Sequence, residues 1–192
     1  QIAVGADGAS MVAWRAQPDE LICPEPCSQS RIEAVRIDRV GGKSTRKFAT
    51  ESSSTFASGA AGVRSIPTVA SDGKGGFAVG WAESPADPSA ASIRFRRFNA
   101  AGDLGTLGAL EVGADAASLT AQPRPLTFAT SFQTGAQAVW IAKDAKGMLK
   151  LRTVRLARTA APDRTVQLGG AVDAARPEPI SASGADGTLA VV

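Results

Sequence analysis

The side chains that carry out most protein chemistry are sparse in this chain of 192 residues. There is no His and no Tyr, which excludes an imidazole base, an imidazole metal ligand and a sialidase-type tyrosine nucleophile within the chain. Asp19, Glu20 and Glu25 share one stretch of sequence, and Glu83 and Asp87 share another. Glycoside hydrolysis needs two carboxylates about 5–10 Å apart, and no spacing here pairs two of them. The sequence therefore contains no catalytic motif and favours a protein that is not an enzyme.

The two cysteines frame the segment Cys23-Pro24-Glu25-Pro26-Cys27. A zinc site usually takes four ligands, often from two cysteine pairs, and the chain has no second pair. A thioredoxin-type motif has two residues between its cysteines, and this spacing is longer. We therefore expect a disulfide between Cys23 and Cys27 that closes a local loop, which implies an oxidising compartment. Two free thiols in a cytosolic protein are the alternative.

Three aspartates are each followed by glycine, at Asp7, Asp72 and Asp186. Calcium takes about six to eight oxygen ligands, usually with several carboxylates in one loop. Each of these segments offers one carboxylate, and the third repeat described below has none at the equivalent place. Asp-Gly between short apolar runs is typical of a hairpin turn. We therefore expect turns here, and no metal or cofactor.

Charged residues of both signs are mixed along the chain: 21 Lys and Arg against 18 Asp and Glu give a net charge of +3. A nucleic-acid binder usually concentrates basic side chains on one face, so no nucleic-acid partner is expected. The apolar stretches are far shorter than the roughly 20 residues that span a bilayer, so no membrane span is expected. Basic residues do recur in two alternating segments. We expect them to lie on solvated strand faces, and a basic stripe that binds heparin or DNA is the alternative. These residues are Arg94, Arg96, Arg97, Lys150, Arg152 and Arg155.

An internal repeat indicates the elements that position these side chains. Three segments align on a tryptophan, at Trp14, Trp81 and Trp140, and a fourth copy begins at Pro179. Successive tryptophans are roughly 60 residues apart, the length of a unit of short strands with long loops. The predicted units are residues 1–65, 66–122, 123–175 and 176–192, of which the last is incomplete.

Each unit has the same internal order of four strands. A short apolar strand leads through a turn to a second strand that ends at the tryptophan. After a variable loop, a basic alternating strand follows at 32–38, 93–98 and 149–156, and a short fourth strand at 109–112 and 165–168. Four antiparallel strands joined by turns make one propeller blade, and no segment has helical periodicity. We expect an all-β fold, a partial β-propeller of about three and a half four-stranded antiparallel blades.

Residues 66–113 carry the repeat most completely, as Pro-x-Val-Ala, Asp-Gly, Gly-Phe-x-Val-x-Trp and Ile-x-x-Arg-Arg-Phe-Asn-Ala-x-Gly-x-x-Gly. In this pattern the chain resembles the propeller-type repeats of large secreted or surface-anchored bacterial proteins. The flanking copies fit less well, because the first carries the cysteine segment and the third has Phe132-Gln133 in place of Asp-Gly. The resemblance implies a scaffold that is extracellular, periplasmic or on the cell surface, and it implies no activity.

The repeated tryptophans are predicted to pack between neighbouring sheets, because blades bury their flat faces only against one another. An aromatic platform for a sugar is the alternative. Phe77, Phe95 and Phe98 are expected in the same layer. Pro67, Pro125 and Pro179 open the first strand of a unit, where a free strand edge tolerates proline.

The two longest irregular stretches, 15–30 and 50–65, follow a second strand and a fourth strand. They should therefore lie on the same face of the propeller, where loops on a rigid scaffold often bind partners. Ordinary loop variability is the alternative. The candidate binding residues on this face are Arg15, Asp19, Glu20, Glu25, Thr50 and Arg64.

The chain opens in a first strand and stops after a second strand, so the expected partners include the remaining blades of the same ring or another copy of the chain. The predicted function is a non-catalytic extracellular scaffold or protein-binding module with a protein or glycan partner. The alternative is a segment of a propeller glycosidase or lyase, or a carbohydrate-binding module, whose active residues lie in further blades.

Overall fold

The computed structural model describes residues 1–16, 31–39, 45–48, 63–84, 92–111, 126–131, 135–143, 146, 148–155, 164–167, 181–183 and 189–191. Within these ranges the regular elements are all β-strands, and no helix there is long and apolar enough to cross a membrane. In chain order the strands are β1 (Ile2–Val4), β2 (Ser10–Ala16), β3 (Arg31–Ile37), β4 (Thr45–Phe48), β5 (Val63–Arg64), β6 (Thr68–Ser71), β7 (Phe77–Ser84), β8 (Ser92–Phe98), β9 (Leu104–Glu111), β10 (Leu126–Ser131), β11 (Gly135–Lys143), β12 (Leu149–Arg155), β13 (Arg164–Gln167), β14 (Ser181–Ser183) and β15 (Leu189–Val191).

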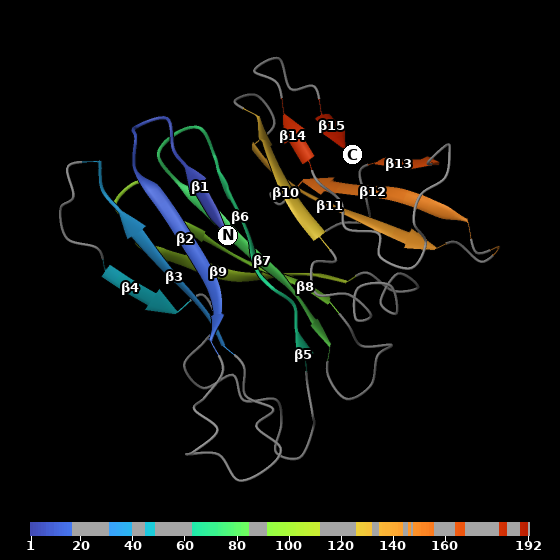
Figure 1. The fold of residues 1–192 in the computed structure, drawn as a ribbon, viewed down its shortest axis with the longest axis horizontal. Helices are drawn as coiled ribbons and strands as arrows, with labels where there is room; N and C mark the ends of the chain where they lie inside the picture. Colours follow the sequence, from blue (N-terminus) through green and yellow to red (C-terminus); the bar gives the residue numbers. More distant parts are fainter. Residues whose placement is uncertain are drawn as a thin grey trace, which may run out of the picture.

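The strands form four separate antiparallel sheets in chain order (Figure 1). The first sheet is β1-β2-β3-β4, the second is built on β7-β8-β9, the third is β10-β11-β12-β13, and the fourth is β14-β15. The predicted all-β class is thus confirmed. The described strands form no closed ring of sheets. The fourth strand of the second sheet, β9, starts at Leu104 and is longer than the predicted segment.

The hairpin turns form where Asp-Gly and Asn-x-x-Gly occur in the sequence. Asp72 Oδ1 accepts hydrogen bonds from the backbone N–H of Lys74 at 2.7 Å and of Gly76 at 2.8 Å. Asp7 Oδ1 accepts one from Ala9 N at 3.1 Å in the first sheet. Gly73 has a φ of 73°, which a residue with a Cβ adopts only at a cost. These aspartates therefore serve turn geometry, as the sequence indicates.

The inner strand of the second sheet is interrupted, because β5 and β6 both pair with β7 and are separated by Ser65, Ile66 and Pro67. Ser65 maintains the ladder across the break. Its N–H donates to Ala82 O at 2.9 Å, and its Oγ accepts from Ala82 N at 2.9 Å. The side chain of Ser65 thus takes the place of a backbone acceptor for the N–H of Ala82. The break sets Arg64 opposite Glu83.

The first and second sheets pack through unlike faces. The first sheet contributes small and slender side chains, and the second contributes large ones. One buried cluster joins them: Ala9, Met11, Ala13, Ile32 and Ala34 from the first sheet, and Val69, Phe77, Val79, Trp81 and Phe98 from the second.

The second and third sheets repeat this arrangement. Ala70, Ala78 and Ala82 of the second sheet lie in one cluster with Phe128 and Trp140 of the third. The backbone N–H of Phe128 also donates to Thr68 Oγ1 across the interface at 3.1 Å. The first strands of the sheets succeed one another, because β6 contacts both β1 and β10, and β10 contacts β14.

Gly80 allows the third sheet to approach the second closely. A Cβ added at Gly80 would lie 2.7 Å from Cε2 and 2.8 Å from Cε1 of the Phe128 ring. Glycine weakens most strands, but here it leaves the space that the phenyl ring fills.

The predicted packing of the tryptophans is confirmed at two positions of three. Trp81 and Trp140 are buried, each on the face of its sheet that is covered by the preceding sheet. Trp14 is only half-buried. Phe77, Phe95 and Phe98 are buried as expected. Trp81 and Trp140 are therefore closed to a sugar and do not form the alternative aromatic platform.

Candidate functional site

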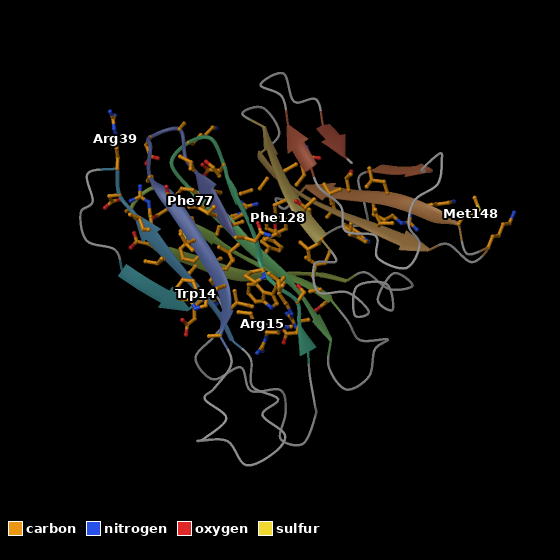
Figure 2. All side chains as sticks on the ribbon, in the orientation of Figure 1. Trp14, Arg15, Arg39, Phe77, Phe128 and Met148 are labelled. Atoms are coloured by element: carbon orange, nitrogen blue, oxygen red, sulfur yellow. The ribbon has the colours of Figure 1, made fainter. Side chains whose placement is uncertain are left out.

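Two of the predicted binding-face residues meet where β2 and β5 come together, between the first and second sheets. Arg15 extends from the end of β2, and its Nη1 donates a hydrogen bond to the backbone O of Arg64 at 2.7 Å. Figure 2 shows Arg15 at the end of β2, on the side toward β5. The remaining predicted residues lie outside the described part of the chain: Asp19, Glu20, Glu25 and Thr50, together with Cys23 and Cys27 and their predicted disulfide.

Arg64 is held by a carboxylate on the neighbouring strand. Its Nη2 donates to Glu83 Oε1 at 3.3 Å, and its side chain is 2% exposed. Glu83 is 17% exposed. Breaking such a buried pair by removing one partner typically costs about 3–5 kcal/mol, because the other charge stays in a medium of low dielectric constant. The pair therefore fixes β5 against β7 at this end of the sheet.

The second carboxylate oxygen of Glu83 is engaged by two further groups. Trp81 Nε1 donates to Oε2 at 3.2 Å, and Arg94 Nε lies 3.9 Å from the same oxygen. Side chains two apart in a strand lie on the same face, which places Trp81 beside Glu83. Arg94 joins them because the ladder pairs it with Trp81. We call Arg15, Arg64, Glu83 and Arg94 the arginine–glutamate cluster.

The arginine–glutamate cluster has three guanidinium groups and one carboxylate, so it carries a surplus of positive charge. Both oxygens of Glu83 already have partners, which leaves this carboxylate poorly placed to act as a general acid or base. Arg94 is the most open member, with its side chain 38% exposed. The arrangement is thus suited to attracting an anionic group at the loop end of the two sheets.

A second ion network lies at the opposite end of the first sheet. Arg36 Nη2 lies 3.0 Å from Asp7 Oδ2, and Arg36 Nη1 also bonds to Asp38 Oδ1. Both carboxylates are well exposed. Asp7 also accepts a backbone hydrogen bond within its turn, so this network ties the β1–β2 turn to β3. In the described residues, no group of three or more His, Cys, Asp and Glu could hold a metal ion.

Sequence reasoning identified the members of the arginine–glutamate cluster separately and did not bring them together. Glu83 stood out only as one of two carboxylates in a stretch, and Arg94 only as part of an alternating basic strand. The signal that links them is the spacing Trp81-x-Glu83, which places an indole N–H and a carboxylate on one strand face. The partner of that carboxylate, Arg64, comes from the preceding strand through a break that no periodicity reveals.

Comparisons with known proteins give matches of low similarity among solved structures. No protein-family model matches the chain, and no curated protein matches it. Among solved structures, the chain is similar to an endo-arabinase from Bacteroides thetaiotaomicron VPI-5482, with 14% sequence identity and a TM-score of 0.41. The match covers 89% of this chain and 55% of that chain, so this chain spans about half the length of the enzyme. At this level the similarity assigns no residue, substrate or activity to the chain.

Proposed function

We propose that the chain is a propeller-type binding module that recognises an acidic protein surface with the end of its first two sheets where β2 and β7 finish. The observation that carries the proposal is the arginine–glutamate cluster, in which Arg64 and Arg94 contact the carboxylate of Glu83 and Arg15 contacts the backbone oxygen of Arg64. The succession of four-stranded sheets, joined through β1, β6, β10 and β14, supports a propeller-type scaffold beneath it. An extracellular, periplasmic or cell-surface location rests on the predicted Cys23–Cys27 disulfide and is part of the proposal.

A protein partner is favoured over a glycan by the state of the aromatic side chains. Sugar-binding modules commonly stack a sugar ring on an open aromatic face. Trp81, the indole at this end of the second sheet, is fully buried and donates its N–H to Glu83. The most open group of the cluster is the guanidinium of Arg94, whose side chain is 38% exposed, and a guanidinium binds carboxylates through charge-assisted hydrogen bonds.

Isothermal titration calorimetry with poly-L-glutamate tests the proposal. We expect binding that weakens as salt is added, because exposed charges are screened. Arg94→Ala should weaken it about five-fold, the equivalent of about 1 kcal/mol for one exposed guanidinium. Arg97→Ala is the matched control: it removes an exposed arginine from the same strand, outside the cluster. Equal affinities for the two variants would contradict the proposal.

Two further arms of the same experiment separate the alternatives retained from the sequence. Tighter binding of polygalacturonate than of poly-L-glutamate would replace the acidic protein by an acidic glycan. Release of reducing ends from linear arabinan or pectin would establish a glycosidase or lyase. That activity would require carboxylates other than Glu83, because both of its oxygens are already engaged.

A further inference from the structure

Two arginines of β8 share one face of the second sheet. The pairing of β8 with β9 is regular from Ser92 to Arg96 and shifts only beyond Arg96. Arg94 and Arg96 are two residues apart within this regular part, so they project to the same side. The β7–β8 ladder sets them opposite Trp81 and Val79, which both pack against the first sheet. We call Arg94 and Arg96 the arginine pair.

The arginine pair is more exposed than the side chains beside it. Trp81 and Val79 are fully buried, whereas the Arg94 side chain is 38% exposed and Arg96 is half-buried. A long arginine stem commonly covers apolar surface while its charged end stays in water. The Nε of Arg94 is the buried nitrogen of its guanidinium, and it lies on the side of Glu83 Oε2. The Nη groups are therefore the part of Arg94 that a ligand can reach.

Other arginines between the first and second sheets are already engaged within the protein. Arg15 donates to the backbone oxygen of Arg64, whose own side chain is buried. Arg36, at the turn end of the first sheet, is bound to Asp7 and Asp38, and its side chain is 15% exposed. The spacing that a ligand must match is therefore that of the arginine pair, not that of a longer basic stripe.

The spacing of the arginine pair is that of alternate side chains in an extended peptide. A strand rises about 3.4 Å per residue, so residues two apart on β8 are separated by about 7 Å. In an extended ligand, every second side chain faces the same way at the same spacing. Two adjacent carboxylates in such a ligand would face opposite sides, so only one of them could meet the arginine pair.

We propose that the arginine pair binds an extended segment of the acidic partner protein that carries carboxylates at alternate positions, as in Glu-x-Glu or Asp-x-Asp. Each guanidinium takes one carboxylate through charge-assisted hydrogen bonds. This inference rests on the proposed function and specifies the ligand of the same surface.

Calorimetric titration with two synthetic peptides of equal length and composition tests the spacing. One peptide alternates Glu and Ser, and the other carries two Glu followed by two Ser in each repeat. When extended, the second peptide presents a carboxylate on a given face only at every fourth residue. The alternating peptide should bind the wild-type chain about five-fold more tightly, the equivalent of about 1 kcal/mol for one additional exposed ion pair.

Two variants assign this preference to the arginine pair. Arg96→Ala should bind the two peptides with similar affinity. Arg97→Ala is the matched control and should keep the preference, because Arg97 pairs with Ala78 on the face toward the third sheet. A circular dichroism melt checks the fold of both variants. Arg96→Gln keeps a long polar side chain without the charge, and it replaces Arg96→Ala if that variant does not fold.

The outcomes separate this inference from the proposed function. Equal affinities of the wild-type chain for the two peptides would overturn the inference, and so would a preference that survives the loss of Arg96. If poly-L-glutamate still binds and Arg94→Ala still weakens it, the proposed function stands and only the spacing is wrong. Absence of binding to poly-L-glutamate and to both peptides would overturn both.

Discussion

Replacing Gly80 with Ala measures how closely the second and third sheets approach each other. In most strands this change stabilises a protein by about 0.5–1 kcal/mol, because glycine loses more backbone freedom on folding. Here the new methyl group would lie 2.7 Å from Cε2 and 2.8 Å from Cε1 of Phe128. Overpacking of a buried interface costs about 1–3 kcal/mol. The net effect should therefore be a loss of about 1–2 kcal/mol in the free energy of unfolding.

Urea unfolding of the wild type and four variants measures this loss and tests whether the ring of Phe128 causes it. Gly105→Ala is the control, since a Cβ there would lie no closer than 3.4 Å to another group, and it should be neutral or slightly stabilising. Phe128→Leu removes the ring edge, so Gly80→Ala should cost at least about 1 kcal/mol less in that background. If Gly80→Ala stabilises the chain as Gly105→Ala does, the ring of Phe128 does not lie over Gly80 and the stacking of the two sheets is wrong.

Two further predictions concern the indole layer and the arginine–glutamate cluster. Trp81→Ala should lower the free energy of unfolding by about 3–5 kcal/mol, whereas Trp14→Ala, at the half-buried tryptophan of the first sheet, should cost less than half as much. Equal shifts in the urea midpoint would contradict this difference in burial. Glu83→Gln should cost about 3 kcal/mol, because it removes the charge that faces the buried Arg64, whereas Asp38→Asn, at an exposed ion pair, should cost less than about 1 kcal/mol. Similar losses for these two variants in the same assay would show that Arg64 is not held by Glu83.

The parts of the fold that depend on neighbouring residues could be predicted from the sequence. Asp72-Gly73 forms a turn because the aspartate and its glycine act within a few residues of each other. The alternation in residues 93–98 predicts a strand because side chains two apart share a face. The predicted third strands differ from β3, β8 and β12 by no more than one residue at either end, which is the usual uncertainty of a strand boundary.

The parts that depend on contacts between distant segments could not be predicted. The break at Ser65 depends on a side-chain hydroxyl that replaces a backbone partner, and no pattern of apolar residues marks it. The pairing of Arg64 with Glu83 follows from this break, so the sequence placed Arg64 on a binding face and left Glu83 unassigned. Trp14 aligns with Trp81 in the repeat, yet Trp14 is half-buried and Trp81 is fully buried. The spacing of the repeat is the same around both tryptophans, so it does not predict this difference in burial.

The central claim is that successive sheets stack face to face, with an aromatic ring of one sheet over a glycine of the other. A ¹³C-edited nuclear Overhauser experiment tests it at both interfaces. A Cβ at Gly5 would lie 3.1 Å from Cζ of Phe77, as one at Gly80 would lie close to the ring of Phe128. We predict cross-peaks from the Phe77 ring to the Gly5 Hα protons and from the Phe128 ring to the Gly80 Hα protons. Absence of both in the folded protein would contradict the stacking.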